Sequence, residues 1–120
     1  MTKIAQGKDF LGATIDVEFD RPLGTVHPKF PDMIYPINYG FVPNTKAGDG
    51  DAIDVYYLSS DQPLKTVTAQ CIGYVHRMDD NEDKLIASDG TKYTEAEIEK
   101  ILEFQEKWFK HKIILWEGEK

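Results

Sequence analysis

Residues 49–58 read D-G-D-A-I-D-V-Y-Y-L, an acidic turn that runs directly into an apolar segment. Asp-Gly is a typical turn signal, and the valine, tyrosines and leucine after it are typical of a strand that begins near Ala52. One of the three carboxylates, Asp54, falls inside the strand pattern, where a charge is unfavourable unless it is paired or binds a metal. Two carboxylates about 5 Å apart repel by about 3 kcal/mol at an effective dielectric of about 20, and a divalent cation removes that repulsion. The segment therefore predicts a strand whose start carries hard oxygen ligands of the kind that suit Mg²⁺, Mn²⁺ or Ca²⁺.

Two other structures besides a metal site are consistent with a turn of this kind. An Asx-type turn with solvated acids carries no ligand, and it is the more common outcome for an isolated Asp-Gly-Asp. An EF-hand loop needs an acid or Asn at its fifth position, Gly at the sixth and Glu at the twelfth. Counted from Asp49, those positions hold Ile53, Asp54 and Ser60, so the sequence excludes an EF-hand.

Outside this segment, the chain has further strand patterns and one clear helix. The other expected strands span residues 13–19, 35–42, 66–76, 84–87 and 113–116, with a bend at Gly73 and an acidic turn at 78–83. Thr94 and Glu97 form a capping box, and apolar residues then recur at helical spacing as far as Lys110 and His111. Several strands with one late amphipathic helix predict an α+β, mainly β fold: a small closed OB-type barrel with the helix packed on it.

Length, charge and cysteine content narrow the function classes. The 120 residues predict a single domain over 1–120, and the net charge of −7 argues against a nucleic-acid partner. No apolar run approaches the length of a membrane span, so no membrane partner is expected. The single cysteine, Cys71, lies in an apolar strand pattern and is expected to be buried, which fits a reducing, cytoplasmic environment.

A second acidic cluster, Asp79, Asp80, Glu82 and Asp83, is followed at once by Lys84. Taken alone it is typical of a solvated hairpin tip, and His76 and Arg77 beside it are expected to form surface ion pairs. If the fold brings this cluster against the turn at Gly50, the combined carboxylates would need several divalent cations. The sequence leaves both interpretations open.

Three motifs together resemble the soluble family I inorganic pyrophosphatases. Residues 35–42 read Y-P-I-N-Y-G-F-V, similar to the family's Y-P-x-N-Y-G-Y/F segment, and residues 49–55 match its D-G-D-P-x-D-V with Ala52 in place of Pro. Residues 78–85 resemble its M-x-D…D-x-K-L segment with two residues missing. The alignable region runs from about Ile15 to Ala87, and the chain resembles a compact bacterial subgroup. The resemblance implies hydrolysis of pyrophosphate to two orthophosphates by a metal-activated water, with Mg²⁺ as the cofactor and Mn²⁺ or Co²⁺ as possible substitutes.

The resemblance also implies roles for individual residues. The metal ligands it implies are Asp49, Asp54, Asp80, Glu18 through a water, and Glu82 or Asp83, between which the shortened loop leaves the register ambiguous. Asp51 matches the carboxylate that takes a proton from the attacking water, and Tyr39 matches a tyrosine near that nucleophile. Lys84 matches a phosphate-binding lysine, and Arg21 a phosphate-binding arginine. The family further implies a homo-oligomer.

The departures from the family pattern leave the activity open to alternatives. Trp108 and Phe109 stand where the family has a Tyr-Lys pair on its late helix, and both are expected, with Phe104, to lie in the core. An early phosphate-binding lysine lacks a clear counterpart, for which Arg21, His27 or Lys29 would have to compensate. We therefore expect weaker or altered substrate binding. The alternatives are a metal- and phosphate-binding module with little turnover, or a hydrolase of another phosphoanhydride.

Overall fold

The strands and the helix follow one another in the order that the sequence predicts. The computed structural model describes residues 4–48, 50–79 and 81–117. Its elements are the 3-10 helix η1 (Gly7–Phe10), the strands β1 (Thr14–Arg21), β2 (Asn38–Phe41), β3 (Asp54–Tyr57), β4 (Thr66–Arg77) and β5 (Glu82–Ser88), the helix α1 (Glu95–Glu106) and the strand β6 (His111–Leu115).

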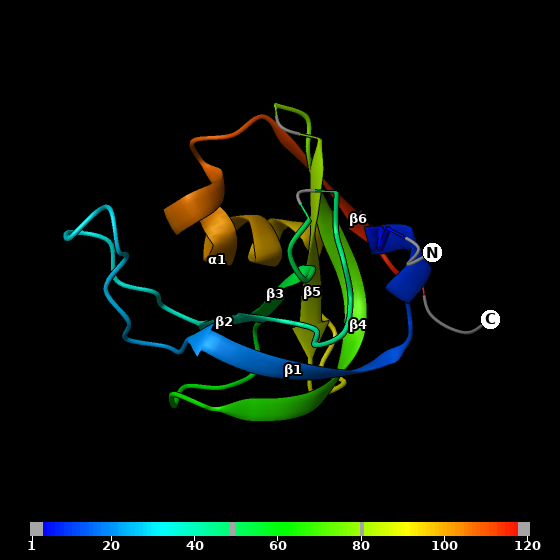
Figure 1. The fold of residues 1–120 in the computed structure, drawn as a ribbon, viewed down its shortest axis with the longest axis horizontal. Helices are drawn as coiled ribbons and strands as arrows, with labels where there is room; N and C mark the ends of the chain where they lie inside the picture. Colours follow the sequence, from blue (N-terminus) through cyan, green and yellow to red (C-terminus); the bar gives the residue numbers. More distant parts are fainter. Residues whose placement is uncertain (1–3, 49, 80, 118–120) are drawn as a thin grey trace.

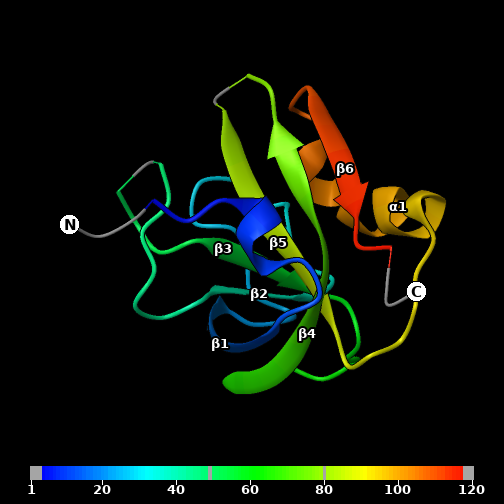
Figure 2. The same ribbon diagram turned by 90° about the vertical axis from the view of Figure 1, so that its right-hand side faces the viewer.

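Five of the strands form a ring. The strand order is β1-β2-β3-β5-β4, and β4 returns to β1 by antiparallel pairing of residues 66–70 with 14–18. β3 and β5 are parallel, whereas the other neighbours in the sheet are antiparallel. β6 lies outside the ring and pairs with the second half of β4 (Figure 1, Figure 2). The expected barrel is thus confirmed as a barrel-like ring of strands that carries one α-helix within the described residues.

The interior of the ring is filled by one apolar cluster. Side chains of β1 alternate between buried and exposed, so that Ile15, Val17 and Phe19 point inward while their neighbours face solvent. They pack with residues such as Val55 of β3 and Leu85 of β5. The expected burial of Cys71 is confirmed, since its thiol belongs to this cluster.

A second apolar cluster lies between the outer face of the ring and α1. Tyr56 and Ile86 point outward from β3 and β5 and pack against Ile98 and Leu102 of the helix. β3 and β5 are therefore buried on both faces, which is why their sequences are continuous apolar runs rather than alternating ones. The capping box that starts α1 is confirmed by the reciprocal hydrogen bonds between Thr94 and Glu97. Within the described ranges, no helix has the length and apolar character that crossing a bilayer requires.

The expected bend at Gly73 is also confirmed. The pairing register between β4 and β5 shifts between Cys71 and Gly73. A Cβ atom at position 73 would lie 2.7 Å from the backbone carbonyl oxygen of Ile114, so a side chain does not fit between β4 and β6. The glycine lets β4 bend and still pair with β6 at this point.

The helix ends earlier than its apolar periodicity predicts. α1 stops at Glu106, not near Lys110 and His111, because residues 111–115 instead pair with the edge of β4, starting with His111 opposite Arg77. The amide of Phe109 donates a hydrogen bond to the Glu106 carbonyl in the turn between helix and strand. This turn leaves Trp108 67% exposed, so the prediction that it lies in the core is wrong.

The second acidic cluster is divided by the start of β5. The expected turn at 78–83 is shorter than predicted, because Glu82 and Asp83 already pair with Arg77 and His76 in the β4–β5 hairpin. Asn81 takes a left-handed conformation (φ 54°), as is common for Asn in a tight turn. Since successive strand residues point to opposite faces, Glu82 and Lys84 share one face and Asp83 points to the other.

Candidate active site

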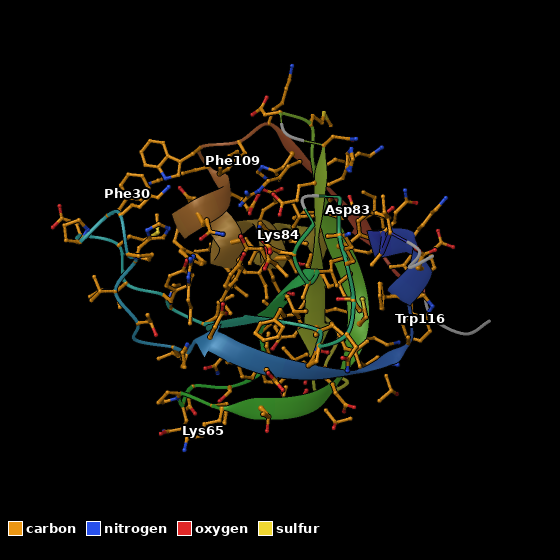
Figure 3. All side chains as sticks on the ribbon, viewed as in Figure 1. Phe30, Lys65, Asp83, Lys84, Phe109 and Trp116 are labelled. Atoms are coloured by element: carbon orange, nitrogen blue, oxygen red, sulfur yellow. The ribbon has the colours of Figure 1, made fainter. Side chains whose placement is uncertain are left out.

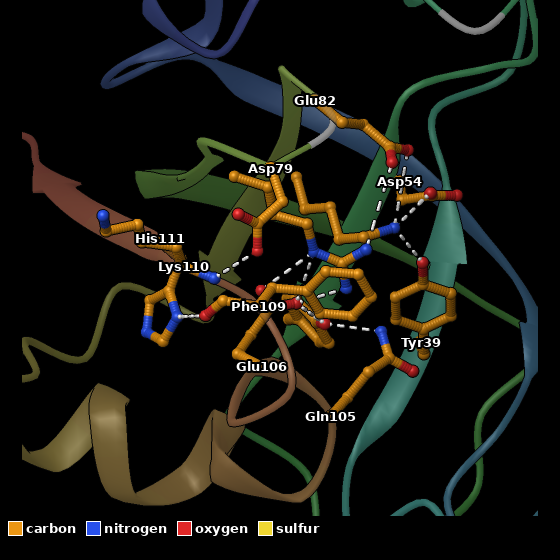
Figure 4. A network of polar contacts seen from close by, with 12 residues as sticks. Tyr39, Asp54, Asp79, Glu82, Gln105, Glu106, Phe109, Lys110 and His111 are labelled. Carbon is orange, nitrogen blue, oxygen red and sulfur yellow. Dashed lines mark hydrogen bonds and ion pairs between the residues drawn. The ribbon is translucent and has the colours of Figure 1, made fainter.

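A lysine, a carboxylate and a phenol meet on the outer face of the ring. The Lys84 ammonium donates hydrogen bonds to Asp54 Oδ2 and to the Tyr39 hydroxyl, each at 2.6 Å (Figure 4). Asp54 and Lys84 are direct partners in the parallel β3–β5 pair, and Tyr39 comes from β2 on the other side of β3. Three adjacent strands therefore fix the position of one cation.

Glu82 is the second carboxylate near this lysine. Its Oε1 lies 3.7 Å from the Lys84 ammonium, and its Oε2 lies 4.0 Å from the Arg77 guanidinium. Asp83 points elsewhere, where it contacts His76 Nδ1 at 2.6 Å and accepts a hydrogen bond from the Gly7 amide at 2.7 Å, beside η1 (Figure 3). The structure thus brings Glu82 to Lys84 and turns Asp83 toward the other side of the sheet.

Burial makes the Tyr39 phenol a stable neutral group. Desolvation and, after it, the negative charge of Asp54 raise the pKa of Tyr39 well above its usual value. Tyr39 therefore acts here as a neutral acceptor that helps to hold the Lys84 ammonium, and it stays protonated throughout the physiological pH range.

Behind this group lies a buried ion pair between Arg77 of β4 and Glu106 of α1. Nε of Arg77 donates to Glu106 Oε1 at 2.9 Å, and a terminal nitrogen donates to Oε2 at 2.6 Å. Burial alone would lower the pKa of Arg77, but its hydrogen bonds with Glu106 raise it above the ordinary value. The ring of Phe109 covers the guanidinium, with its centroid 3.8 Å from Cζ. The predicted surface ion pair of Arg77 is therefore wrong, because only 5% of this residue is exposed.

A chain of hydrogen bonds runs from this ion pair toward Arg21. Tyr56 donates to Glu106, Gln105 donates to the Tyr56 hydroxyl at 2.6 Å, and the Tyr35 hydroxyl donates to Gln105 Oε1 at 3.0 Å. Arg21 then donates to the Tyr35 hydroxyl at 2.7 Å. Side chains from α1, β3 and the loop before β2 therefore position the Arg21 guanidinium at the end of β1.

Sequence reasoning missed Glu106 and Arg77 as members of this site. The signal for Glu106 is the helical spacing itself, because Leu102 and Glu106 are four residues apart and share the face that packs on the sheet. A charged residue that continues an apolar helix face requires a buried partner of opposite charge. No comparable pattern marks Arg77, since its burial depends on how closely α1 and the turn after it approach β4.

An open cleft of about 890 Å³ gives access to these residues. Its basic lining residues are Arg21, Arg77, Lys84 and Lys107. Its large apolar lining residues are Phe30, Met33, Ile34, Phe104, Trp108 and Phe109. The cleft lies between the proline-rich loop of residues 22–37, which follows β1, and the end of α1, and Lys84 and Tyr39 form part of its lining.

The other implied phosphate-binding residues lie at this cleft or near it. Arg21, half-buried, has its Cζ 5.9 Å from the centre of the Tyr39 ring, so the structure brings it to the Lys84 group. His27 lines the cleft and stacks on Tyr35 with ring centroids 6.0 Å apart. Lys29 is exposed, and its amide donates to Nδ1 of His27.

The remaining implied ligands are only partly placed by the structure. Glu18 lies exposed on β1, opposite Phe41 of β2. Asp51 is exposed in the turn before β3, and its backbone carbonyl accepts a hydrogen bond from the Ala47 amide. Asp49 and Asp80 lie outside the described residues. Among the residues that are described, no three His, Cys, Asp or Glu side chains form a group that would hold a metal ion.

Comparison with known proteins gives a consistent result for most of the chain. The family model for inorganic pyrophosphatase matches residues 12–116. An inorganic pyrophosphatase of Aquifex pyrophilus is 36% identical over 83 residues, which cover 63% of this chain and 47% of the relative. One of Helicobacter pylori is 44% identical over 57 residues, covering 44% and 33%. The chain thus spans about half the length, or less, of these curated relatives.

Solved structures of similar fold belong to proteins named as inorganic pyrophosphatases. An inorganic pyrophosphatase from Ehrlichia chaffeensis superposes with a TM-score of 0.69 at 19% identity, covering 97% of this chain and 92% of that one. One from Neisseria gonorrhoeae gives a TM-score of 0.58 at 27% identity, covering 78% and 72%. At 19% identity the first of these demonstrates a shared fold alone.

Proposed function

The chain belongs to the inorganic pyrophosphatase family, and on this premise we propose that it hydrolyses inorganic pyrophosphate to two orthophosphates in a metal-dependent reaction. The observation that carries the proposal is the Lys84 ammonium, held by Asp54 and Tyr39 in the lining of the cleft. All three residues fall in the motifs that resemble the family. A fixed cation at a cleft is what stabilises the charge of a phosphoryl group during transfer.

The carboxylates near Lys84 are of the right kind for a hard divalent cation. Asp54 and Glu82 both approach the Lys84 ammonium, and Glu82 also lies 4.0 Å from the Arg77 guanidinium. Carboxylate oxygens are the ligands that Mg²⁺ prefers in proteins. We propose that Asp54 and Glu82, together with Asp49 and Asp80, hold Mg²⁺, and that Mn²⁺ or Co²⁺ can replace it. When bound, such ions lower the pKa of a coordinated water and neutralise phosphate charge.

The chain's own side chains would then bind and orient the substrate. Lys84 and Arg21 are the cations proposed to contact phosphate oxygens, and Tyr39 holds the Lys84 ammonium in place. Asp51 is exposed in the turn before β3, and we propose it as the general base that accepts a proton from the attacking water. Its exposure lets it release that proton to solvent after each turnover.

Glu18 and Asp83 enter this proposal with less support. Glu18 faces outward on β1, where a contact to a metal would have to run through a water. Asp83 already contacts His76 and the Gly7 amide, so its proposed role as a ligand would require it to leave both partners. Of the two residues between which the register is ambiguous, we therefore favour Glu82.

Location and assembly are part of the same proposal. Relatives from Chlamydomonas reinhardtii and rice are named soluble inorganic pyrophosphatases, and a cytoplasmic location of this chain would fit that name. A homo-oligomer is proposed from family resemblance, and the exposed apolar residues around the cleft offer one possible contact surface.

A binding module with little turnover is the alternative, and one observation favours it. Trp108 and Phe109 line the cleft, and the resemblance implies that they replace a tyrosine and a lysine, so that a phosphate contact would be lost. The deciding experiment measures orthophosphate release from Mg²⁺-pyrophosphate by the purified protein, with Mn²⁺ and Co²⁺ in parallel. Release well above the rate without enzyme supports hydrolysis. Pyrophosphate that stabilises the protein thermally in the presence of Mg²⁺ without being cleaved would establish the binding module instead.

A further inference from the structure

Much of the cleft lining is apolar, and pyrophosphate has no apolar group that would contact it. Pyrophosphate contains no carbon, whereas much of the lining comes from large apolar side chains, of which Phe30, Ile34 and Trp108 are 56%, 58% and 67% exposed. Exposed apolar groups that gather at a concave site mark a place where a ligand or a partner is bound. A volume of about 890 Å³ also matches clefts that hold small organic molecules, which run from about 300 to 1,000 Å³.

The same lining also carries charged residues, which indicate the charge of a second part of the ligand. The cleft has four Arg and Lys residues and one acid, Asp32, in a chain whose net charge is −7. Arg21 donates to the neutral Tyr35 hydroxyl, and the Lys107 ammonium lies 4.9 Å from the Trp108 ring. Arg77 is already paired with Glu106 and Lys84 with Asp54, so it is mainly Arg21 and Lys107 that attract an anion to the lining.

The apolar walls favour an aromatic group over an aliphatic one. The His27 and Phe30 rings both line the cleft, with centroids 5.0 Å apart, and the buried Tyr35 ring stacks on His27 at 6.0 Å. Trp108 adds an indole from the turn after α1. Rings of this kind bind flat aromatic groups by stacking, as in proteins that bind nucleic-acid bases.

We propose that the cleft takes organic phosphoanhydrides that carry an aromatic group, with nucleoside 5′-diphosphates as the simplest members, as substrates of the active site. The inference rests on the proposed pyrophosphate hydrolysis. The diphosphate lies at Lys84 and Arg21, and the aromatic group lies between Phe30 and Trp108. Water attacks the terminal phosphorus, and the bond from that phosphorus to the bridging oxygen breaks. The products are orthophosphate and the nucleoside monophosphate, with release of one proton at neutral pH.

Binding is measured first, with analogues that cannot be cleaved. The α,β-methylene analogue of ADP and methylenediphosphonate differ by the nucleoside, so the ratio of their dissociation constants in Mg²⁺ reports contacts to that group. We expect the ADP analogue to bind about tenfold more tightly, the effect of stacking one base. Trp108→Ala and Phe30→Ala should each remove most of this preference. Ile4→Ala, at an apolar side chain that is 52% exposed and lies outside the cleft lining, should leave it unchanged.

Turnover is then measured with ADP, with pyrophosphate and with an isoprenyl diphosphate as an aliphatic comparison. ADP hydrolysis that falls in Trp108→Ala relative to pyrophosphate hydrolysis supports the proposal. Three results would each overturn it. Two of them are equal affinity of the two analogues and equal rates with the aliphatic and aromatic diphosphates. The third is tight binding of the ADP analogue without ADP hydrolysis, in a protein that still hydrolyses pyrophosphate. If neither substrate is cleaved although the ADP analogue is preferred, the proposed hydrolysis fails while the ligand class stands. A Trp108→Ala variant that dissociates an oligomer without changing the affinity ratio would assign these side chains to a subunit contact instead.

Discussion

Asp54 and Lys84 lie directly opposite each other across the parallel pair of β3 and β5, with the carboxylate 2.6 Å from the ammonium. Thirty positions separate them in the chain. The register of the β3–β5 pair brings Asp54, at the end of the first acidic segment, next to Lys84, which directly follows the second. The pair also orients Lys84 toward the cleft, since Tyr39 and Asp54 accept hydrogen bonds from the same nitrogen. A cation held in this way loses little conformational freedom when an anionic substrate binds.

Replacing Lys84 by Met should reduce pyrophosphate turnover by about 10²–10³-fold, because a positioned cation near the transferred phosphoryl group is lost. Lys84→Arg should recover part of the rate, since it restores the charge without the same geometry. Lys65→Met, at an exposed position outside the cleft lining, is the matched control and should retain the full rate. The measurement is orthophosphate release at saturating Mg²⁺. A Lys84→Met rate within twofold of that control would remove Lys84 from the site.

Replacing Asp51 by Asn should lower turnover by about 10²–10⁴-fold while Mn²⁺ binding, measured by calorimetry, stays close to the original affinity. The amide keeps the shape of the side chain but cannot accept the proton. Asp61→Asn, another exposed acid outside the cleft lining, should have little effect on either quantity. An Asp51→Asn variant with the original rate would show that another group takes the proton.

The sequence predicts the order of the strands, whereas it predicts only some of the contacts that form the site. Period-two alternation places β1, and the apolar runs place β3 and β5, because burial of those side chains determines the pattern. The choice between Glu82 and Asp83 depends on where β5 begins, and a turn of polar residues leaves that point undetermined. The sequence predicts the end of α1 too late for a similar reason, since helical periodicity continues beyond the residue at which the chain begins to pair with β4.

Replacing Glu106 by Gln should lower the free energy of unfolding by about 3–5 kcal/mol, because the buried Arg77 guanidinium then loses the carboxylate with which it is hydrogen-bonded. Denaturation by urea, followed by the helix signal in circular dichroism, measures this loss. Glu103→Gln, one exposed residue on the same helix, should change stability by less than about 0.5 kcal/mol. The double variant Arg77→Met with Glu106→Leu should be more stable than Glu106→Gln alone. Equal stability of the Glu106→Gln and Glu103→Gln variants would contradict a net role of the buried pair.

The Cys71 thiol should not react with a thiol reagent in the folded protein. Burial raises the pKa of Cys71 to about 11, so little thiolate forms at neutral pH, and the side chain is enclosed by the core of the ring. At about pH 8, a colorimetric disulfide reagent should label the native protein only as fast as it unfolds, and should label one thiol at once in concentrated guanidinium chloride. Rapid labelling of the native protein would show that the core opens locally around β4.

His111 should make the protein more stable at acidic than at alkaline pH. Burial on its own would lower the pKa of His111, but the Phe109 carbonyl and the Glu99 carboxylate raise it above 6.5. Nδ1 lies 2.9 Å from that carbonyl and Nε2 lies 2.9 Å from that carboxylate, and both oxygens only accept hydrogen bonds. Both ring nitrogens must then carry a proton, so the arrangement is satisfied fully by the imidazolium alone.

Since the folded pKa of His111 is the higher one, its contribution is fully present below pH 6.5 and is lost as the pH rises through the folded value. His111→Gln should therefore be less stable than the original protein at about pH 5, by about 0.5 kcal/mol for a partly exposed pair, and the difference should shrink by about pH 9. Urea denaturation across this range measures the difference, and NMR titration of the imidazole gives the pKa directly. Glu99→Gln should lower that pKa, because the neutral amide no longer favours the charged ring. A stability difference that grows with pH would mean that His111 is buried as the neutral base.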